Sequence, residues 1–134
     1  MEPHRIELIR ASWNNILPIK EQAAAMFYQR LFELDPSLKP MFKGDIKEQG
    51  DKLMKTLTVA ISSLTQLDIL LPILQDMARR HVDYGVKDEH YALVGQALID
   101  TLATAFGDDF NEELKSAWVE MYQTVADAMI AATK

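Results

Sequence analysis

The sequence of 134 residues contains no cysteine. This absence excludes disulfide bonds, thiolate nucleophiles and every zinc or iron–sulfur site that is built on cysteine. Metal chemistry must therefore use histidine or carboxylate ligands. Histidine is also scarce, because the sequence has only His4, His81 and His90.

Glycine and proline are infrequent, with five residues of each, and 49% of the residues are apolar. This composition and length are typical of one globular unit, so residues 1–134 are expected to form a single domain. Long apolar runs are missing, since no segment approaches the roughly 20 residues of a membrane span. The N-terminal segment "MEPHRIELIR" lacks the pattern of a signal peptide. We therefore expect a cytoplasmic protein with no membrane partner.

Basic residues are fewer than acidic ones, 14 against 20, which gives a net charge of −6. The lysines and arginines are scattered along the sequence and form no stripe of the kind that follows a phosphate backbone. We therefore expect no nucleic-acid partner, and we interpret the acidic charge as a contribution to solubility.

Apolar residues recur at helical spacing along nearly the whole sequence, and no segment shows the alternation of a strand. The expected fold class is therefore all-α, with about seven helices. The last two helices, at 88–106 and 110–132, are the longest and are expected to pair as an antiparallel hairpin, with Asp109 and Glu112 opening the second. Helices are expected to end at Pro18, 35–40, Gly44, Pro72, Tyr84 with Gly85, and 106–113.

The helix expected over 45–64 carries a lone glutamine on an apolar face. Gln49 heads a stripe that continues through Leu53, Thr56 and Ala60 at helical spacing. In one interpretation, Gln49 is an exposed end position on a core helix. In the other, its amide faces a pocket.

His81 also allows two interpretations. A histidine in the last turn of a helix is favoured by the helix macrodipole and needs no metal. However, Leu74, Met77 and Ala78 precede it by seven, four and three residues, so the imidazole is expected to project from an apolar patch. Tyr28, in the aromatic cluster "MFYQRLF", likewise needs a polar partner if it is buried. A tyrosine, a glutamine and a histidine around an apolar space suit a flat apolar cofactor whose metal takes one imidazole.

The order of Trp13, "FYQRLF", "PSLKPMF", "KEQGDKLM", "RRHVDYGV" and "EHYALVGQALI" resembles the globin family. The resemblance is greatest to single-domain bacterial globins and to the globin half of flavohaemoglobins, and it covers essentially the whole sequence. Ala92 stands where the bacterial members usually have proline within "HYALVG". The resemblance implies a fold of helices packed three over three around haem b.

The same resemblance assigns roles to individual residues. It implies that His81 is the proximal ligand of the iron, and that Phe42 stacks on the porphyrin. It places Tyr28 and Gln49 beside the bound gas, with Leu53 shaping the space between them. The residues expected along the haem on the proximal side or at its edge are Lys52, which reaches a propionate, Met77, Val86, Tyr91, which braces His81, and Val94.

Two hydrogen-bond donors beside a bound gas imply tight oxygen binding with slow release, and nitric oxide and carbon monoxide are further expected ligands. Neither His4 nor His90 suits the distal face, so ligation by two histidines is not expected. Thr133 stands where flavohaemoglobins have a bracing glutamate, which argues against a dedicated peroxidase. No flavin or nicotinamide fingerprint is present, so an external reductase is the expected electron donor.

Several functional interpretations remain open. Oxygen scavenging or storage and oxidation of nitric oxide to nitrate require the same pocket. The alternative is a haem-free domain with a globin fold that serves signalling or interaction. The expected oligomeric state is a monomer or a weak homodimer.

Overall fold

The computed structural model describes residues 2–41, 45–83 and 87–132. Within these ranges the chain is helical and contains no strand, which confirms the all-α fold class. The α-helices are α1 (Pro3–Ile16), α2 (Lys20–Leu34), α3 (Ile46–Ser62), α4 (Leu67–Asp83), α5 (Asp88–Phe106) and α6 (Glu112–Ala132). Three short 3-10 helices are η1 (Leu17–Ile19), η2 (Pro36–Met41) and η3 (Gly107–Asp109).

Pro18 and Pro72 are both predicted to end a helix, but only Pro18 does so. Pro18 lies in η1 and separates α1 from α2, as predicted. The break predicted at Pro72 is wrong, because this residue lies inside α4. Pro72 stands in the second turn, and both Pro72 and Asp68 are exposed residues, so the helical hydrogen bond that the proline removes lies on an exposed part of α4. The breaks predicted at Gly44, Tyr84 and Gly85 lie outside the described residues.

Polar side chains cap the N-termini of two of the helices. Asp45 precedes α3, and its carboxylate accepts a hydrogen bond from the backbone N–H of Lys47 at 2.9 Å. At the start of α6 the side-chain oxygen of Asn111 accepts from the N–H of Leu114 at 2.9 Å. The prediction that Asp109 opens this helix is therefore wrong, because Asp109 belongs to η3 and Asn111 is the capping residue.

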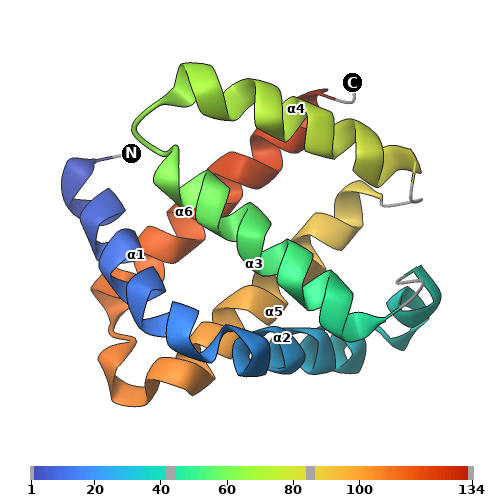
Figure 1. The fold of residues 1–134 in the computed structure, drawn as a ribbon, viewed down its shortest axis with the longest axis horizontal. Helices are drawn as coiled ribbons and strands as arrows, with labels where there is room; N and C mark the ends of the chain where they lie inside the picture. Colours follow the sequence, from blue (N-terminus) through green and yellow to red (C-terminus); the bar gives the residue numbers. More distant parts are fainter. Residues whose placement is uncertain (1, 42–44, 84–86, 133–134) are drawn as a thin grey trace.

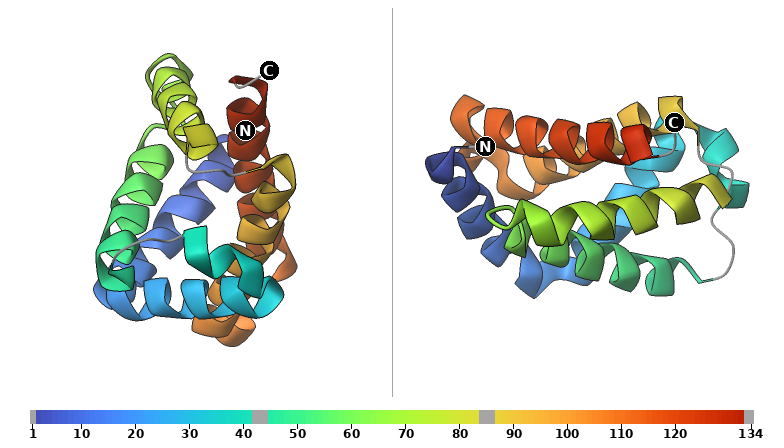
Figure 2. Two further views of the ribbon diagram at one scale, coloured as in Figure 1. Left: turned by 90° about the vertical axis from the view of Figure 1, so that its right-hand side faces the viewer. Right: turned by 90° about the horizontal axis from the view of Figure 1, so that it is seen from above.

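Four of the helices are arranged as two pairs on opposite sides of the molecule, and α2 crosses between the pairs at one end (Figures 1 and 2). Figure 2 shows α3 and α4 along one side and α5 and α6 along the other, with α2 crossing at one end and contacting both α3 and α5. The two longest helices, α5 and α6, pack on each other as predicted, and α4 packs along α6. None of the helices in the described part of the chain combines the length and apolar character needed to cross a bilayer.

Two buried tryptophans tie three helices together. The rings of Trp13 and Trp118 lie 6.0 Å apart between centroids. The indole N–H of Trp13 donates to Thr58 Oγ1 on α3 at 3.0 Å, and that of Trp118 donates to Ser12 Oγ on α1 at 2.9 Å. Both residues are therefore core aromatics whose polar atoms are satisfied.

Candidate functional site

Tyr28 and Gln49, which lie 21 residues apart in the sequence, meet where α2 contacts α3. The side chain of Tyr28 is buried, and its hydroxyl donates to the backbone carbonyl oxygen of Gln49 at 3.3 Å. This distance exceeds the usual O–H···O length of about 2.7–2.8 Å, so the bond is weak. Phe27 and Phe32 pack against the phenol ring, with centroid distances of 5.1 and 6.1 Å. The phenol of Tyr28 therefore has largely apolar surroundings and lies beside half-buried Gln49.

A glycine next to Gln49 permits this close meeting of the helices. A Cβ atom added to Gly50 would lie 2.9 Å from the Cβ of Ala24 on α2 and 4.0 Å from the ring of Tyr28. A side chain at position 50 would therefore push α3 away from α2. The sequence pattern alone does not reveal this role of Gly50; its one signal is a glycine inside a helix, which costs about 1 kcal/mol relative to alanine.

Burial also makes the phenol of Tyr28 a weaker acid. Loss of hydration raises the pKa of the phenol from 10.0 to about 12, because the charged phenolate is disfavoured away from water. The hydroxyl therefore keeps its proton at neutral pH. Tyr28 is consequently available there as a hydrogen-bond donor.

His81 lies in the last turn of α4 with a defined ring orientation. Its Nδ1 is 2.6 Å from the backbone carbonyl oxygen of Met77. A carbonyl oxygen can only accept a hydrogen bond, so Nδ1 must carry the proton and the lone pair of the neutral ring is on Nε2. Leu74 and Ala78 are buried and Met77 is half-buried, which confirms the predicted apolar patch below the imidazole.

Tyr91 on α5 lies beside His81. The two rings are nearly parallel, with centroids 6.2 Å apart and an interplanar angle of 20°. The hydroxyl of Tyr122 on α6 donates to the backbone carbonyl oxygen of Tyr91 at 2.6 Å. Helical periodicity places Tyr122 on an apolar face of α6, but it does not show which backbone oxygen the hydroxyl reaches.

The other residues expected at the site differ in their burial. Leu53, Met77 and Val94 are half-buried and pack against the core, whereas Lys52 is exposed. Phe42 and Val86 lie outside the described residues. The structure thus brings together two pairs by direct contact, Tyr28 with Gln49 and His81 with Tyr91.

The other two histidines are engaged elsewhere. Nε2 of His4 lies 2.8 Å from a carboxylate oxygen of Glu113, which links α1 to α6. Nδ1 of His90 accepts a hydrogen bond from the backbone N–H of Lys87 at 3.0 Å, at the start of α5. His81 is therefore the histidine whose surroundings suit a metal ligand.

The donor set around His81 fits haem. Among the described residues, no group of three or more histidine or carboxylate side chains is placed to hold a metal ion. A porphyrin supplies four ligands itself and needs only one imidazole from the protein. An imidazole with its proton held on Nδ1 and an apolar patch below it meets that need.

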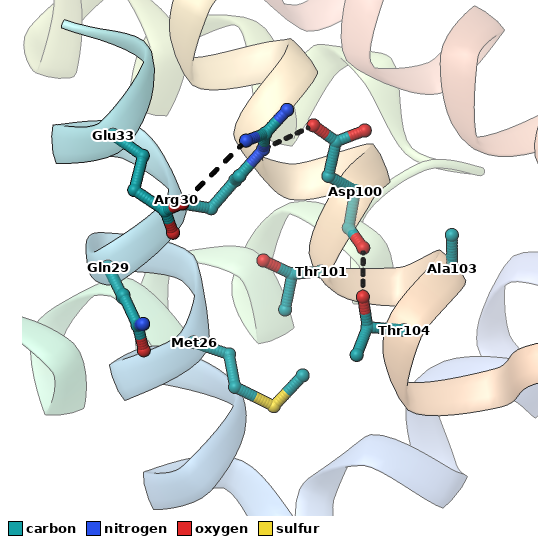
Figure 3. A pocket seen from close by; sticks show the side chains of 8 residues that line it. All are labelled: Met26, Gln29, Arg30, Glu33, Asp100, Thr101, Ala103 and Thr104. Carbon is teal, nitrogen blue, oxygen red and sulfur yellow. Dashed lines mark hydrogen bonds and ion pairs between the residues drawn. The ribbon is translucent and has the colours of Figure 1, made fainter.

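A depression of about 510 Å³ between α2 and α5 involves none of these residues (Figure 3). Its charged side chains are paired, since Nε of Arg30 donates to the carboxylate of Asp100 at 2.8 Å. The other oxygen of Asp100 accepts from the amide of Gln96 at 2.8 Å. The charges of Arg30 and Asp100 therefore satisfy each other, and the depression contributes nothing to the site.

The fold is similar to that of a solved bacterial globin from Campylobacter jejuni. The TM-score is 0.85, with 25% sequence identity and coverage of 98% of this chain and 95% of that one. Residues 25–129 match the family model for Globin. The chain therefore belongs to the globin family, and the expected globin fold is confirmed.

Two further relatives come from different branches of the family. The sequence is 33% identical to neuroglobin of Danio rerio over 91% of this chain and 86% of that protein. It is 32% identical to a flavohemoprotein of Chromobacterium violaceum over 78% of this chain, which spans only 26% of that protein. Membership of the globin family supports haem-based binding of oxygen and related gases.

Proposed function

We propose that this globin, with residues 1–134 as one domain, binds haem b through His81 and retains oxygen tightly with the help of Tyr28 and Gln49. The observation that carries the proposal is the placement of Tyr28. Its hydroxyl is buried, protonated at neutral pH and directed to the segment of α3 that carries Gln49. Tight retention supports a role in scavenging or storing oxygen.

His81 is the residue that would hold the cofactor. When bound, haem b would supply an iron that takes the imidazole nitrogen of His81 as a ligand and binds a diatomic gas. The hydrogen bond from Nδ1 to the carbonyl of Met77 restrains rotation of the ring and leaves the lone pair on Nε2. The residues that would line the cofactor are Phe42, Leu53, Met77, Val86, Tyr91 and Val94, with exposed Lys52 available to a propionate.

Tyr28 would slow the release of oxygen. Its 3.3 Å bond to the carbonyl of Gln49 is weak, so the hydroxyl can exchange this acceptor for a partly negative oxygen atom of the gas. Phe27 and Phe32 pack against its ring, and the residue as a whole is buried, which limits the access of competing water. A hydrogen bond to a charged partner contributes about 1.5–3 kcal/mol, which corresponds to roughly 10- to 100-fold slower release. The amide of Gln49 is a second donor.

The experiment is a stopped-flow measurement of oxygen dissociation from the reduced protein. Tyr28→Phe removes only the hydroxyl and is expected to release oxygen about 10- to 100-fold faster than the parent. The control Thr104→Val also removes one hydroxyl, on an exposed face of α5, and should release oxygen at the parental rate. Oxygen release from Tyr28→Phe at the parental rate, with haem bound, would contradict the proposal.

Nitric oxide and carbon monoxide are proposed as further ligands of the same pocket. Carbon monoxide is less polar when bound, so it gains less from the donors of Tyr28 and Gln49. Sustained oxidation of nitric oxide consumes electrons, and for that reaction we propose a separate reductase as the donor. Gas retention itself needs no such partner.

A further inference from the structure

Arg10 on α1 binds the C-terminal end of α3. Its Nη2 donates to the backbone carbonyl oxygen of Ser62 at 3.0 Å and to Thr65 Oγ1 at 3.4 Å, and its Nε donates to the carbonyl oxygen of Ile61 at 3.4 Å. Ile61 and Ser62 end α3, and the last carbonyls of a helix lack partners within it. This end of a helix also carries partial negative charge, so the guanidinium suits the position electrostatically.

A second contact from the same face of α1 holds α3 about one turn earlier. Trp13 follows Arg10 by three residues, a spacing that places both side chains on one face of the helix. The indole N–H of Trp13 donates to Thr58 Oγ1 at 3.0 Å. Helix α1 therefore holds the C-terminal part of α3 at two successive positions.

The segment that Arg10 reaches leads directly into α4. Residues 63–66, here called the α3–α4 turn, join the two helices, and Figure 1 shows α3 and α4 diverging from this turn. Beyond the turn the helices pack mainly on different neighbours, α3 on α2 and α1, and α4 on α6. The α3–α4 turn is therefore the place where the angle between the two helices is set.

The two helices carry site residues at the ends that lie far from this turn. Gln49 is near the start of α3, and His81 is in the last turn of α4. At 1.5 Å per residue, each lies about 20 Å along its helix from the turn. A small change of angle at the turn therefore produces its largest displacement where Gln49 and His81 lie.

We propose that Arg10 is a positioning residue that fixes the α3–α4 turn to α1 and thereby holds Gln49 and His81 at the separation that retains haem. This inference rests on the proposed haem binding through His81. It goes beyond that proposal because Arg10 is assigned no contact with the haem or the gas. Loss of the guanidinium releases the end of α3, so the angle between α3 and α4 varies more widely and haem escapes faster.

The test measures the rate of haem transfer to an excess of a haem-free acceptor globin, together with amide hydrogen exchange of the haem-loaded protein by mass spectrometry. Arg10→Met keeps an apolar stem and removes the guanidinium. It should accelerate haem loss about 3- to 10-fold, the effect of one or two hydrogen bonds, and should speed exchange within residues 57–70. Arg10→Lys keeps the charge but cannot reproduce the geometry of the guanidinium, so its haem loss should fall between those of Arg10→Met and the parent.

A matched control on the same helix separates positioning from general loss of stability. Arg5 pairs with Glu120 on α6, so Arg5→Met also removes an arginine that ties α1 to another helix. It should leave haem loss and exchange within residues 57–70 at the parental values. The inference is overturned if Arg10→Met loses haem at the parental rate, or if Arg5→Met accelerates haem loss equally. If Arg10→Met does not fold, a parental rate in Arg10→Lys overturns it, whereas a parent that takes up no haem would overturn the proposed function.

Discussion

At the scale of single residues, the buried phenol of Tyr28 links the stability of the fold to pH. Its pKa is raised from 10.0 to about 12 by burial, so the folded protein holds the phenolic proton more tightly than the unfolded chain. The resulting contribution to the free energy of unfolding is fully present below about pH 10 and is lost as the pH rises toward about 12. Burial raises the pKa of Tyr122 as well, so this residue acts in the same direction.

This linkage predicts a difference between two proteins at alkaline pH. The free energy of unfolding in urea, measured from about pH 9 to about pH 12, should fall more steeply for the parent than for Tyr28→Phe. Tyr122 is present in both proteins and contributes equally, so the difference reports Tyr28. Parallel curves would mean that the phenol of Tyr28 ionises as easily in the folded protein as in the unfolded chain.

At the scale of helices, Ser12 and Trp118 join α1 to α6. The indole N–H of Trp118 is completely buried, and its acceptor is the hydroxyl of Ser12, which in turn donates to the carbonyl of Ile9. Ser12→Ala would leave the indole N–H without this acceptor. A buried donor that loses its acceptor costs about 1–3 kcal/mol.

We therefore expect Ser12→Ala to lower the free energy of unfolding by about 1–3 kcal/mol, measured by urea denaturation. The control is Ser116→Ala, at an exposed position on α6, which should stay within about 0.5 kcal/mol of the parent. Equal stability of the Ser12→Ala variant and the parent would show that another group or water satisfies the indole.

The helices themselves were largely predictable because their apolar periodicity is strong. The expected helix 88–106 coincides with α5, and the expected helix 45–64 contains α3. The errors lie at helix boundaries, where local alternatives compete. Pro72 is accommodated in the second turn of α4, and Asn111 rather than Asp109 caps α6. Both outcomes depend on which backbone groups face water, which the sequence pattern does not specify.

The candidate site was only partly predictable for a related reason. Helical spacing placed His81 above Leu74, Met77 and Ala78, and the resemblance to globins connected it with Tyr28 and Gln49. Spacing within one helix could not show the bond from Tyr122 to the carbonyl of Tyr91, because that bond joins two helices through residues that are 31 positions apart in the sequence. The close approach at Gly50 likewise depends on how two helices cross.

At the scale of the whole molecule, the fold separates the two pairs of site residues. The pair of Tyr28 and Gln49 belongs to α2 and α3, and the pair of His81 and Tyr91 belongs to α4 and α5. Helix α2 contacts both α3 and α5, and α6 contacts both α4 and α5, so the rest of the bundle holds these elements (Figure 2). This arrangement supports a site in which one pair holds the cofactor and the other retains the gas.

The measurement that tests this account most directly is a titration of the haem-free protein with haemin, followed by visible absorption, for the parent and His81→Gly. The parent should take up haemin in equal molar amount and give a sharp Soret band. His81→Gly should lose this spectrum and regain it when free imidazole is added, and the control His4→Gly should behave as the parent. A parent that binds no haemin, or a His81→Gly variant with the parental spectrum and affinity, would contradict the account.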